Sequence, residues 1–92
     1  MNAYWSDRRR PIYESKQLIY FVSACKHGSF RKAAAALNIN QSTLSRRILG
    51  IEDMAGKKLL SRSIHGVKPT TDGERFLLRA ELALDIIAKI DC

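Results

Sequence analysis

The spacing of apolar residues predicts two helices in the first part of the chain. From about residue 15 to residue 27, apolar side chains recur at intervals of three and four residues, at Leu18, Phe21, Val22 and Cys25. This spacing places them on one face of a helix. Gly28 follows and is suited to end that helix in the left-handed conformation. Ser29 is placed to cap a second, alanine-rich helix over residues 30–37.

A sharp turn is predicted between the second helix and a third helix over residues 41–55. Asn38 tolerates the left-handed conformation and can therefore turn the chain. Ile39 is apolar and is expected to fill the corner between the two helices, and Asn40 is a suitable N-cap for the third. Gly56 ends that helix. Two helices joined by a short turn with a buried residue inside it form a helix-turn-helix.

A step of roughly 100° per residue divides the third helix into two faces. Its core side carries Leu44, Ile48, Ile51 and Ala55. Its outward side carries Ser42, Arg46, Leu49 and Asp53, with Gln41 and Ser45 at the near edge of the first turn and Arg47 toward the flank. The N-terminal residues of such a helix usually meet base edges in a major groove. An ordinary solvated helix face is the alternative.

Those outward side chains have the chemistry that base recognition needs. Gln41 is a candidate to bind adenine, and Arg46 is a candidate to bind guanine, each through two hydrogen bonds. Ser42 and Ser45 are candidates for a base or a phosphate. Arg47 is better placed for a phosphate.

The pattern changes after Gly56 to two short extended segments, residues 59–63 and 67–70. Ile64-His65-Gly66 separates them, and because Gly66 can adopt a positive φ, a hairpin is predicted. A hairpin after a helix-turn-helix is a wing. Basic side chains line its edges over residues 57–69: Lys57, Lys58, Arg62, His65 and Lys68. They suit phosphates or a flanking minor groove, and no neighbour in the sequence is spaced to make His65 an acid or a base.

A last helix is predicted from about residue 72 to the C-terminus, with Thr71 and Glu74 at the spacing of a capping box. It contains more apolar surface than one stripe against so small a domain requires. We expect the excess to pack against a second copy of the same helix or against a downstream domain, and these two are compatible. The candidate dimerisation residues are Phe76, Leu77, Leu78, Leu82, Leu84, Ile86, Ile87 and Ile90.

The formal net charge of +7 is concentrated in the middle of the chain. Residues 26–68 hold nine basic and two acidic side chains, whereas residues 1–25 carry a net +2 and residues 69–92 a net −2. A basic patch confined to one part of a small domain is the footprint expected for a polyanion partner. A merely solvated surface explains the charge alone equally well. Ser29 and Arg31, at the start of the second helix, join the candidate DNA contacts.

Composition excludes several other classes. The chain has 92 residues, enough for one domain, and it has no run of apolar residues long enough to span a membrane. The two cysteines, Cys25 and Cys92, lack metal-ligand spacing and suit a reducing cytoplasm. No nucleophile–base pair or cofactor motif is present, so neither an enzyme nor a cofactor is expected. RNA binding would favour stacking aromatics, whereas the aromatics beyond residue 13 mostly occupy core-type positions.

The first 13 residues show no periodicity and are predicted to form a flexible, solvated arm with three aromatic residues. They include the triplet Arg8-Arg9-Arg10. Insertion of this triplet into a minor groove is the alternative.

The motif residues together resemble the N-terminal DNA-binding domain of LysR-type transcriptional regulators. The likeness covers roughly residues 15–90 and runs Leu18-x-x-Phe21, Gly28-Ser29-Phe30-x-x-Ala33-Ala34-x-x-Leu37-x-x-x-Gln41-Ser42-x-x-Ser45-x-x-Ile48-x-x-x-Glu52-x-x-x-Gly56-x-x-Leu59-x-x-Arg62. The resemblance implies a mainly α fold, with a winged helix-turn-helix of three helices and a two-stranded wing over residues 14–71. A long linker helix over residues 72–92 follows it.

The resemblance also implies a function. It implies sequence-specific binding of double-stranded DNA, with helix 41–55 in the major groove and the wing on the flanking backbone or minor groove. It implies a homodimer through antiparallel linker helices on a partly palindromic promoter site, often assembled further into tetramers, in the bacterial cytoplasm and nucleoid. Any effector ligand would bind a downstream domain absent from this chain. The family's base and phosphate contacts fall on Gln41, Ser42, Ser45 and Arg46, and its wing contact falls on Arg62.

Three positions depart from the family pattern. Ser42 stands where proline is common, which loses a pre-set first turn and gains a hydroxyl. Leu60 stands in place of an aromatic residue, and Pro69 replaces an apolar strand residue, so the wing geometry is expected to differ. The alternative function is a protein-interaction module that uses helix 72–92 as its working surface and the helix-turn-helix as scaffold.

Overall fold

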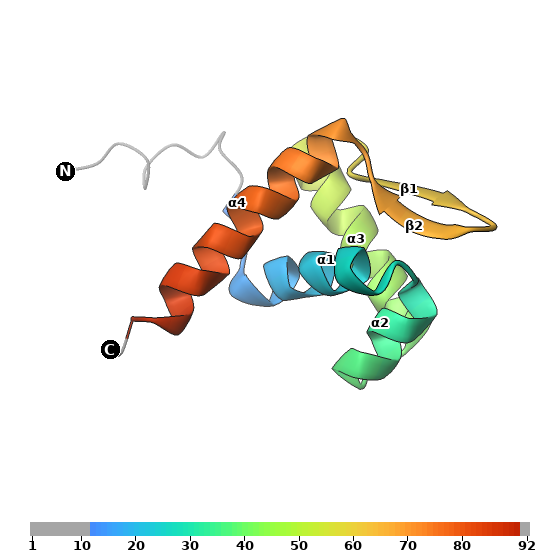
Figure 1. The fold of residues 1–92 in the computed structure, drawn as a ribbon, viewed down its shortest axis with the longest axis horizontal. Helices are drawn as coiled ribbons and strands as arrows, with labels where there is room; N and C mark the ends of the chain where they lie inside the picture. Colours follow the sequence, from blue (N-terminus) through green and yellow to red (C-terminus); the bar gives the residue numbers. More distant parts are fainter. Residues whose placement is uncertain (1–11, 91–92) are drawn as a thin grey trace.

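Four helices and one antiparallel pair of strands make up residues 12–90, the part of the chain that the computed structural model describes (Figure 1). The elements in chain order are α1 (Ser15–His27), α2 (Phe30–Leu37), α3 (Gln41–Ala55), β1 (Leu60–Ser63), β2 (Gly66–Pro69) and α4 (Thr71–Ala88). This order confirms the predicted winged helix-turn-helix with a long last helix. The arginine triplet of the predicted arm and Cys92 lie outside the described residues.

The turn between α2 and α3 is built as its sequence predicts. Asn38 adopts the left-handed conformation, with φ 57° and ψ 46°, and ends α2. The amide of Ile39 donates to the carbonyl of Ala34 at 3.0 Å, and the Ile39 side chain packs against the core. At the other end of α2, the Ser29 hydroxyl accepts a hydrogen bond from the Lys32 amide at 3.2 Å. Local bonds therefore fix both ends of the short helix that supports α3.

The core lies where α1, α2 and α3 meet the first residues of the wing. Its fully buried large side chains are Phe21, Leu44, Ile48, Ile51, Leu59 and Leu60. The predicted core face of α1 is partly wrong, because Val22 and Cys25 are only half-buried whereas Tyr20 and Ala24 are buried. α1 packs against α2, α3 and α4, so its buried face is wider than the single stripe that the spacing indicated.

The wing is an antiparallel pair fastened to the corner between α1 and α2. Its register pairs Leu60 with Pro69 and Ser63 with Gly66, which leaves Ile64 and His65 as the turn. The amide of Val67 donates to the carbonyl of Gly28 at 2.9 Å. Gly66 has a φ of 116°, and a side chain there would collide with the same Gly28 carbonyl. Glycine is therefore required at this position on both counts.

The cap of α4 is Thr70, so the predicted capping box from Thr71 to Glu74 is wrong. The Thr70 hydroxyl accepts from the amide of Gly73 at 3.0 Å and donates to the carbonyl of Lys58 at 2.7 Å. The second bond is a tertiary contact with the segment before the wing. It selects Thr70 over its neighbour and starts the helix at Thr71.

The N-terminal half of α4 belongs to the packed body of the domain. Phe76 makes edge-to-face contacts with Tyr13, at 5.1 Å between ring centroids, and with Phe21, at 4.9 Å. Leu77 also packs against the core and Ala80 is buried. Phe76 and Leu77, predicted as dimerisation residues, are thus half-buried against their own domain, which leaves them less surface for a partner than the prediction supposed. Tyr13, predicted to lie in the arm, is likewise packed.

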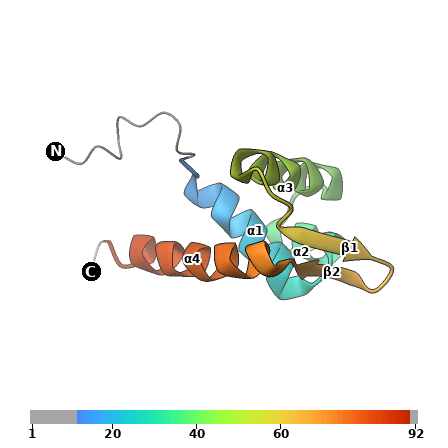
Figure 2. The same cartoon turned by 90° about the horizontal axis from the view of Figure 1, so that it is seen from above.

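The C-terminal half of α4 extends beyond the other helices (Figures 1 and 2). Most of its large apolar side chains are exposed to solvent, among them Leu82 at 57% and Ile86 at 68%. Over residues 12–90, none of the helices combines the length and hydropathy needed to cross a membrane.

Candidate nucleic-acid interface

The outward face of α3 is polar and solvent-exposed, as its periodicity predicts. Gln41, Ser42, Arg46 and Arg47 are exposed, and Ser45 is half-buried at the edge of the face. The opposite face supplies Leu44, Ile48 and Ile51 to the core with no exposed surface. The core therefore holds the helix in one rotation and presents the same side chains outward. Contact of these side chains with bases stays a prediction.

The first turn of α3 also presents backbone donors. Asn40 occupies the predicted N-cap position with extended backbone, and its side chain makes no capping hydrogen bond. The amides of Ser42 and Thr43, from which an N-cap side chain would accept, are thus left without a side-chain cap. Helix N-termini carry partial positive charge and suit an anionic oxygen. This end of α3 combines amide donors with hydroxyl and amide side chains.

Arg62 joins the wing to α3, and no sequence pattern indicated this. Its Nη1 donates to the hydroxyl of Ser45 at 3.2 Å, and its guanidinium lies 4.3 Å from the ring centroid of Phe30. The two contacts link β1, α3 and α2. A planar guanidinium can stack and donate at the same time, which an ammonium cannot. Arg62 therefore sets the position of the wing beside the outward face of α3.

Glu52 makes the second connection between α3 and the wing, and sequence reasoning missed its role. Its side chain is buried, and Oε2 accepts from the amides of Leu59 at 2.8 Å and Leu60 at 3.0 Å. A buried carboxylate is stable only when hydrogen bonds satisfy it, and these two amides do so. The segment that enters β1 is thereby fixed to the last turns of α3. Because Glu52 and Leu59 are seven residues apart, no local sequence pattern indicated this hydrogen bond.

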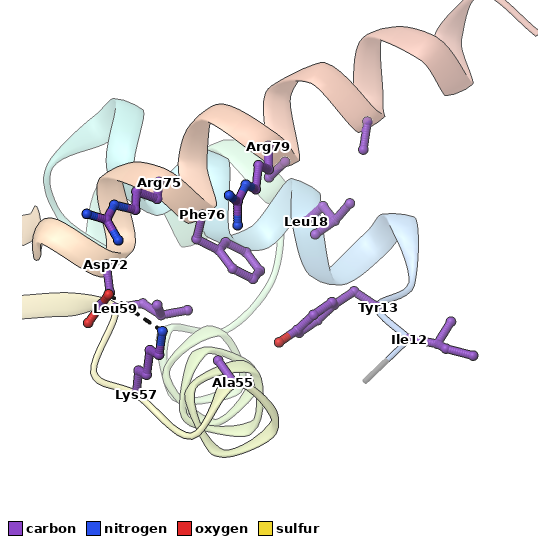
Figure 3. A pocket seen from close by; sticks show the side chains of 12 residues that line it. Ile12, Tyr13, Leu18, Ala55, Lys57, Leu59, Asp72, Arg75, Phe76 and Arg79 are labelled. Carbon is purple, nitrogen blue, oxygen red and sulfur yellow. Dashed lines mark ion pairs between the residues drawn. The ribbon is translucent and has the colours of Figure 1, made fainter. Parts of the chain in front are cut away.

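The remaining predicted basic contacts divide into two groups. Arg31, Lys58, His65 and Lys68 are exposed. Lys57 is also exposed, but its ammonium lies 3.7 Å from the carboxylate of Asp72 on α4 (Figure 3). Because Lys57 follows the C-terminal end of α3, it is remote from the first turn that carries Gln41. The hydroxyl of Ser29 is already engaged in capping α2.

A pocket of about 670 Å³ lies between α1, α4 and the C-terminal end of α3 (Figure 3). Tyr13, Leu18, Leu59 and Phe76 line it with apolar surface. Arg75 and Arg79 come from α4 and add positive charge beside it. The pocket lies at the end of α3 opposite the predicted base contacts, and Lys57 is the one predicted DNA contact among its lining residues.

The titratable side chains of the described residues form no metal-binding cluster. Among residues 12–90, no three His, Cys, Asp or Glu side chains lie close enough to hold a metal ion. Burial, and to a lesser extent the nearby Glu81 carboxylate, raises the pKa of the Cys25 thiol to about 11, while Lys26 opposes the shift. A thiol with such a pKa is protonated at neutral pH and is a poor nucleophile.

Three packed helices, the third with a polar outward face, followed by an antiparallel wing, define a winged helix-turn-helix protein. Residues 15–74 match the family described as bacterial regulatory helix-turn-helix protein, lysR family. The chain belongs to the LysR family of regulators.

Relatives and solved structures agree with this family. The chain is 43% identical over 60 residues to a putative transcriptional regulator of Pseudomonas aeruginosa, covering 65% of this chain and 20% of the relative. It is 37% identical over 76 residues to the HTH-type transcriptional regulator TfdT of Cupriavidus pinatubonensis, covering 83% of this chain and 33% of the relative. The chain thus spans at most a third of the length of these relatives.

Two similar structures are DNA-binding domains solved with DNA. The CbnR_DBD-DNA complex superposes with a TM-score of 0.82 at 30% identity, covering 86% of this chain and 91% of that one. The BenM_DBD/catB site 1 DNA complex gives a TM-score of 0.82 at 37% identity, covering 85% of this chain and 88% of that one.

Proposed function

We propose that this chain binds double-stranded DNA in a sequence-specific manner, as the DNA-binding domain of a LysR-type transcriptional regulator. α3 enters the major groove, and the wing, residues 57–69, contacts the flanking backbone or minor groove. The observation that carries the proposal is the polar first turn of α3 beside a basic wing. Both the N-terminal end of α3 and the turn of the wing lie at the same end of the molecule (Figure 2). DNA complexes of the CbnR and BenM domains support it.

Individual contacts follow from exposure and chemistry. Gln41 and Arg46 are assigned to base edges, because both are exposed in the first turns of α3 and both can make paired hydrogen bonds. Ser42 is assigned to a base or a phosphate, and Arg47, toward the flank of the helix, is assigned to a phosphate. Among the wing residues, Lys58, His65 and Lys68 are free to meet the backbone, whereas Lys57 is engaged with Asp72 and is a weaker candidate.

We further propose that α4 joins two copies of the chain into an antiparallel dimer on a partly palindromic promoter site. Leu78, Leu82 and Ile86 recur every four residues and form one exposed stripe, with exposed fractions of 62%, 57% and 68%. Ile87 and Ile90 extend the exposed apolar surface, and Leu84 is half-buried. Assembly beyond the dimer and sensing of an effector ligand belong to the longer regulator. Such a protein acts in the bacterial cytoplasm, on the nucleoid.

The same exposed stripe supports the second candidate function, a protein-interaction module. That function requires dimerisation or partner binding without salt-sensitive binding of DNA. Measuring duplex binding as a function of salt separates the two, because each neutralised phosphate adds to the slope of log affinity against log salt.

Replacement of Arg46 by alanine tests the assignment of α3 to base recognition. Arg46→Ala is expected to cost roughly 1–3 kcal/mol on the preferred site and to relax the preference at one base pair. Fluorescence anisotropy on the preferred duplex and on single-base variants measures both effects. Arg75→Ala is the matched control. It also removes one positive charge, but on α4 beside the pocket, and should leave the base preference unchanged. Equal loss on every duplex would make Arg46 a phosphate contact.

A further inference from the structure

The most exposed large apolar side chain of residues 12–90 is Ile64, at the turn of the wing. It is 97% exposed, compared with 76% for Ile90, the next highest. A single exposed apolar residue is ordinary on a protein surface. The place of Ile64 in the fold is what distinguishes it: the register puts it in the turn of the wing, and this turn projects from the body of the domain (Figure 1).

Nothing in the local fold calls for isoleucine at this position. The register leaves Ile64 and His65 as the two residues of the turn, where Gly, Asn, Asp and Ser are the usual choices. A β-branched side chain gains no packing there. The backbone is held by other groups, since the Ser63 hydroxyl accepts from the His65 amide at 3.1 Å and Val67 is bonded to Gly28. The turn therefore presents Ile64 outward on a fixed support.

The surroundings of Ile64 are basic. Arg62 precedes it on β1, His65 adjoins it in the turn, and Lys68 follows on β2; all three are exposed. Positive charge on both strands suits an element lying between two rows of phosphates. The bond from Arg62 to Ser45 keeps this element beside the face of α3. A protein partner recognised by apolar contact would not require this charge.

We propose that Ile64 is an apolar contact of the wing with the minor groove that flanks the site bound by α3. The side chain packs on the deoxyribose walls and reaches the floor of the groove, in the manner of apolar side chains of other minor-groove proteins. It favours base pairs without the guanine 2-amino group, because this donor projects into the minor groove and isoleucine cannot accept from it. The inference rests on the proposed function and adds a residue that selects flanking sequence.

The first experiment measures the affinity of Ile64→Ala for the duplex preferred by the unaltered chain. The loss is expected to be on the order of tenfold, from the apolar surface no longer buried. Between roughly 50 and 200 mM salt the affinities of the two proteins should fall in parallel, because no phosphate contact is removed. Ile19→Ala, which truncates an exposed isoleucine on α1, is the matched control and should bind as the unaltered chain does.

The second experiment tests the minor groove directly. Flanking G·C pairs are replaced by inosine·C pairs, which remove the 2-amino group and leave the major-groove edge unchanged. The unaltered chain should bind the inosine duplex more tightly, and Ile64→Ala should lose most of this gain. Thermal unfolding of Ile64→Ala should match that of the unaltered chain, because the residue contacts nothing in the domain.

The outcomes separate the two proposals. If the unaltered chain binds no duplex, the proposed function and this inference both fail. If it binds a preferred duplex and Ile64→Ala binds equally well, only this inference is overturned, and Ile64 is left to contact a protein partner. Equal response of both proteins to inosine would also overturn it.

Discussion

At the scale of single residues, Cys25 shows how the packing of α4 on α1 controls chemistry. Its thiol is half-buried, and burial together with the Glu81 carboxylate raises its pKa to about 11. The folded pKa lies above the ordinary value of 9.0, so the folded state favours the protonated thiol. The stabilisation from this group is therefore complete below pH 9 and is lost as pH rises toward 11.

Alkylation of Cys25 by iodoacetamide should be slow in the folded protein. At pH 7.5 a pKa near 11 leaves roughly a hundredfold less thiolate than a pKa of 9.0. The measurement compares folded protein with protein unfolded in guanidinium, both in a Cys92→Ser background. Glu81→Gln should speed the reaction, whereas Asp85→Asn, which alters the carboxylate paired with Lys89, should not. Equal alkylation rates in the folded and unfolded protein would contradict the raised pKa of the Cys25 thiol.

The residues of the candidate interface were predictable to the extent that helical pitch determines them. Exposure of Ser42 and Arg46 followed from the burial of Leu44 and Ile48 on the other side of α3. The role of Arg62 toward Ser45 was not predictable. The two residues are 17 positions apart and meet only after the wing folds back on the helix.

At the scale of elements, the junction between α3 and the wing depends on one buried carboxylate. Glu52 accepts two amide hydrogen bonds from the segment that enters β1. The hydroxyl of Thr70 closes the same junction from the far side of the wing by donating to Lys58. These bonds connect α3, which is proposed to enter the major groove, to the wing, which is proposed to contact the flanking DNA.

Glu52→Gln should destabilise the protein by about 2 kcal/mol, because a neutral amide replaces a charged acceptor and brings a buried N–H group without a partner. Chemical denaturation measures the free energy of unfolding. Asp53→Asn, at the adjacent exposed position, is the matched control and should change stability by less than about 0.5 kcal/mol. If both variants unfold at the same denaturant concentration, the hydrogen bonds of Glu52 do not hold the junction.

Element types and most element ends were predictable, because local chemistry decides them. Asn38 and Gly56 end α2 and α3 in the left-handed conformation, as their residue types indicate. The start of α4 was misplaced by one residue, since Thr70 and Thr71 are both suitable caps. Only the contact of Thr70 with Lys58, a long-range one, selects between them.

At the scale of the whole molecule, the two proposed surfaces lie on different parts of the fold. The N-terminal end of α3 and the wing face one end, and the exposed half of α4 extends toward the other (Figure 2). One copy can thus hold DNA and a second copy at the same time. The apolar content of α4 predicted a partner surface, but it did not separate Phe76 and Leu77, which pack partly against their own core, from Leu78 and Leu82, which stay exposed.

Leu82→Asp should shift the protein from dimer to monomer, because a carboxylate at the centre of the stripe would be buried without a partner. Sedimentation equilibrium over a range of protein concentrations measures the mass. Leu49→Asp makes the same change at an exposed leucine of α3, with an exposed fraction of 49% against 57% at Leu82, and should leave the mass unchanged. A constant mass for Leu82→Asp would remove α4 from the dimer interface.

Selection of bound duplexes from a random pool tests the central claim most directly. A chain that binds DNA through α3, and pairs through α4, should enrich a motif with two-fold symmetry whose half-sites are set by the separation of the two α3 helices. The same selection with Arg46→Ala should enrich a motif that has lost one defined base pair in each half. Absence of any enriched sequence with the unaltered chain would contradict sequence-specific DNA binding.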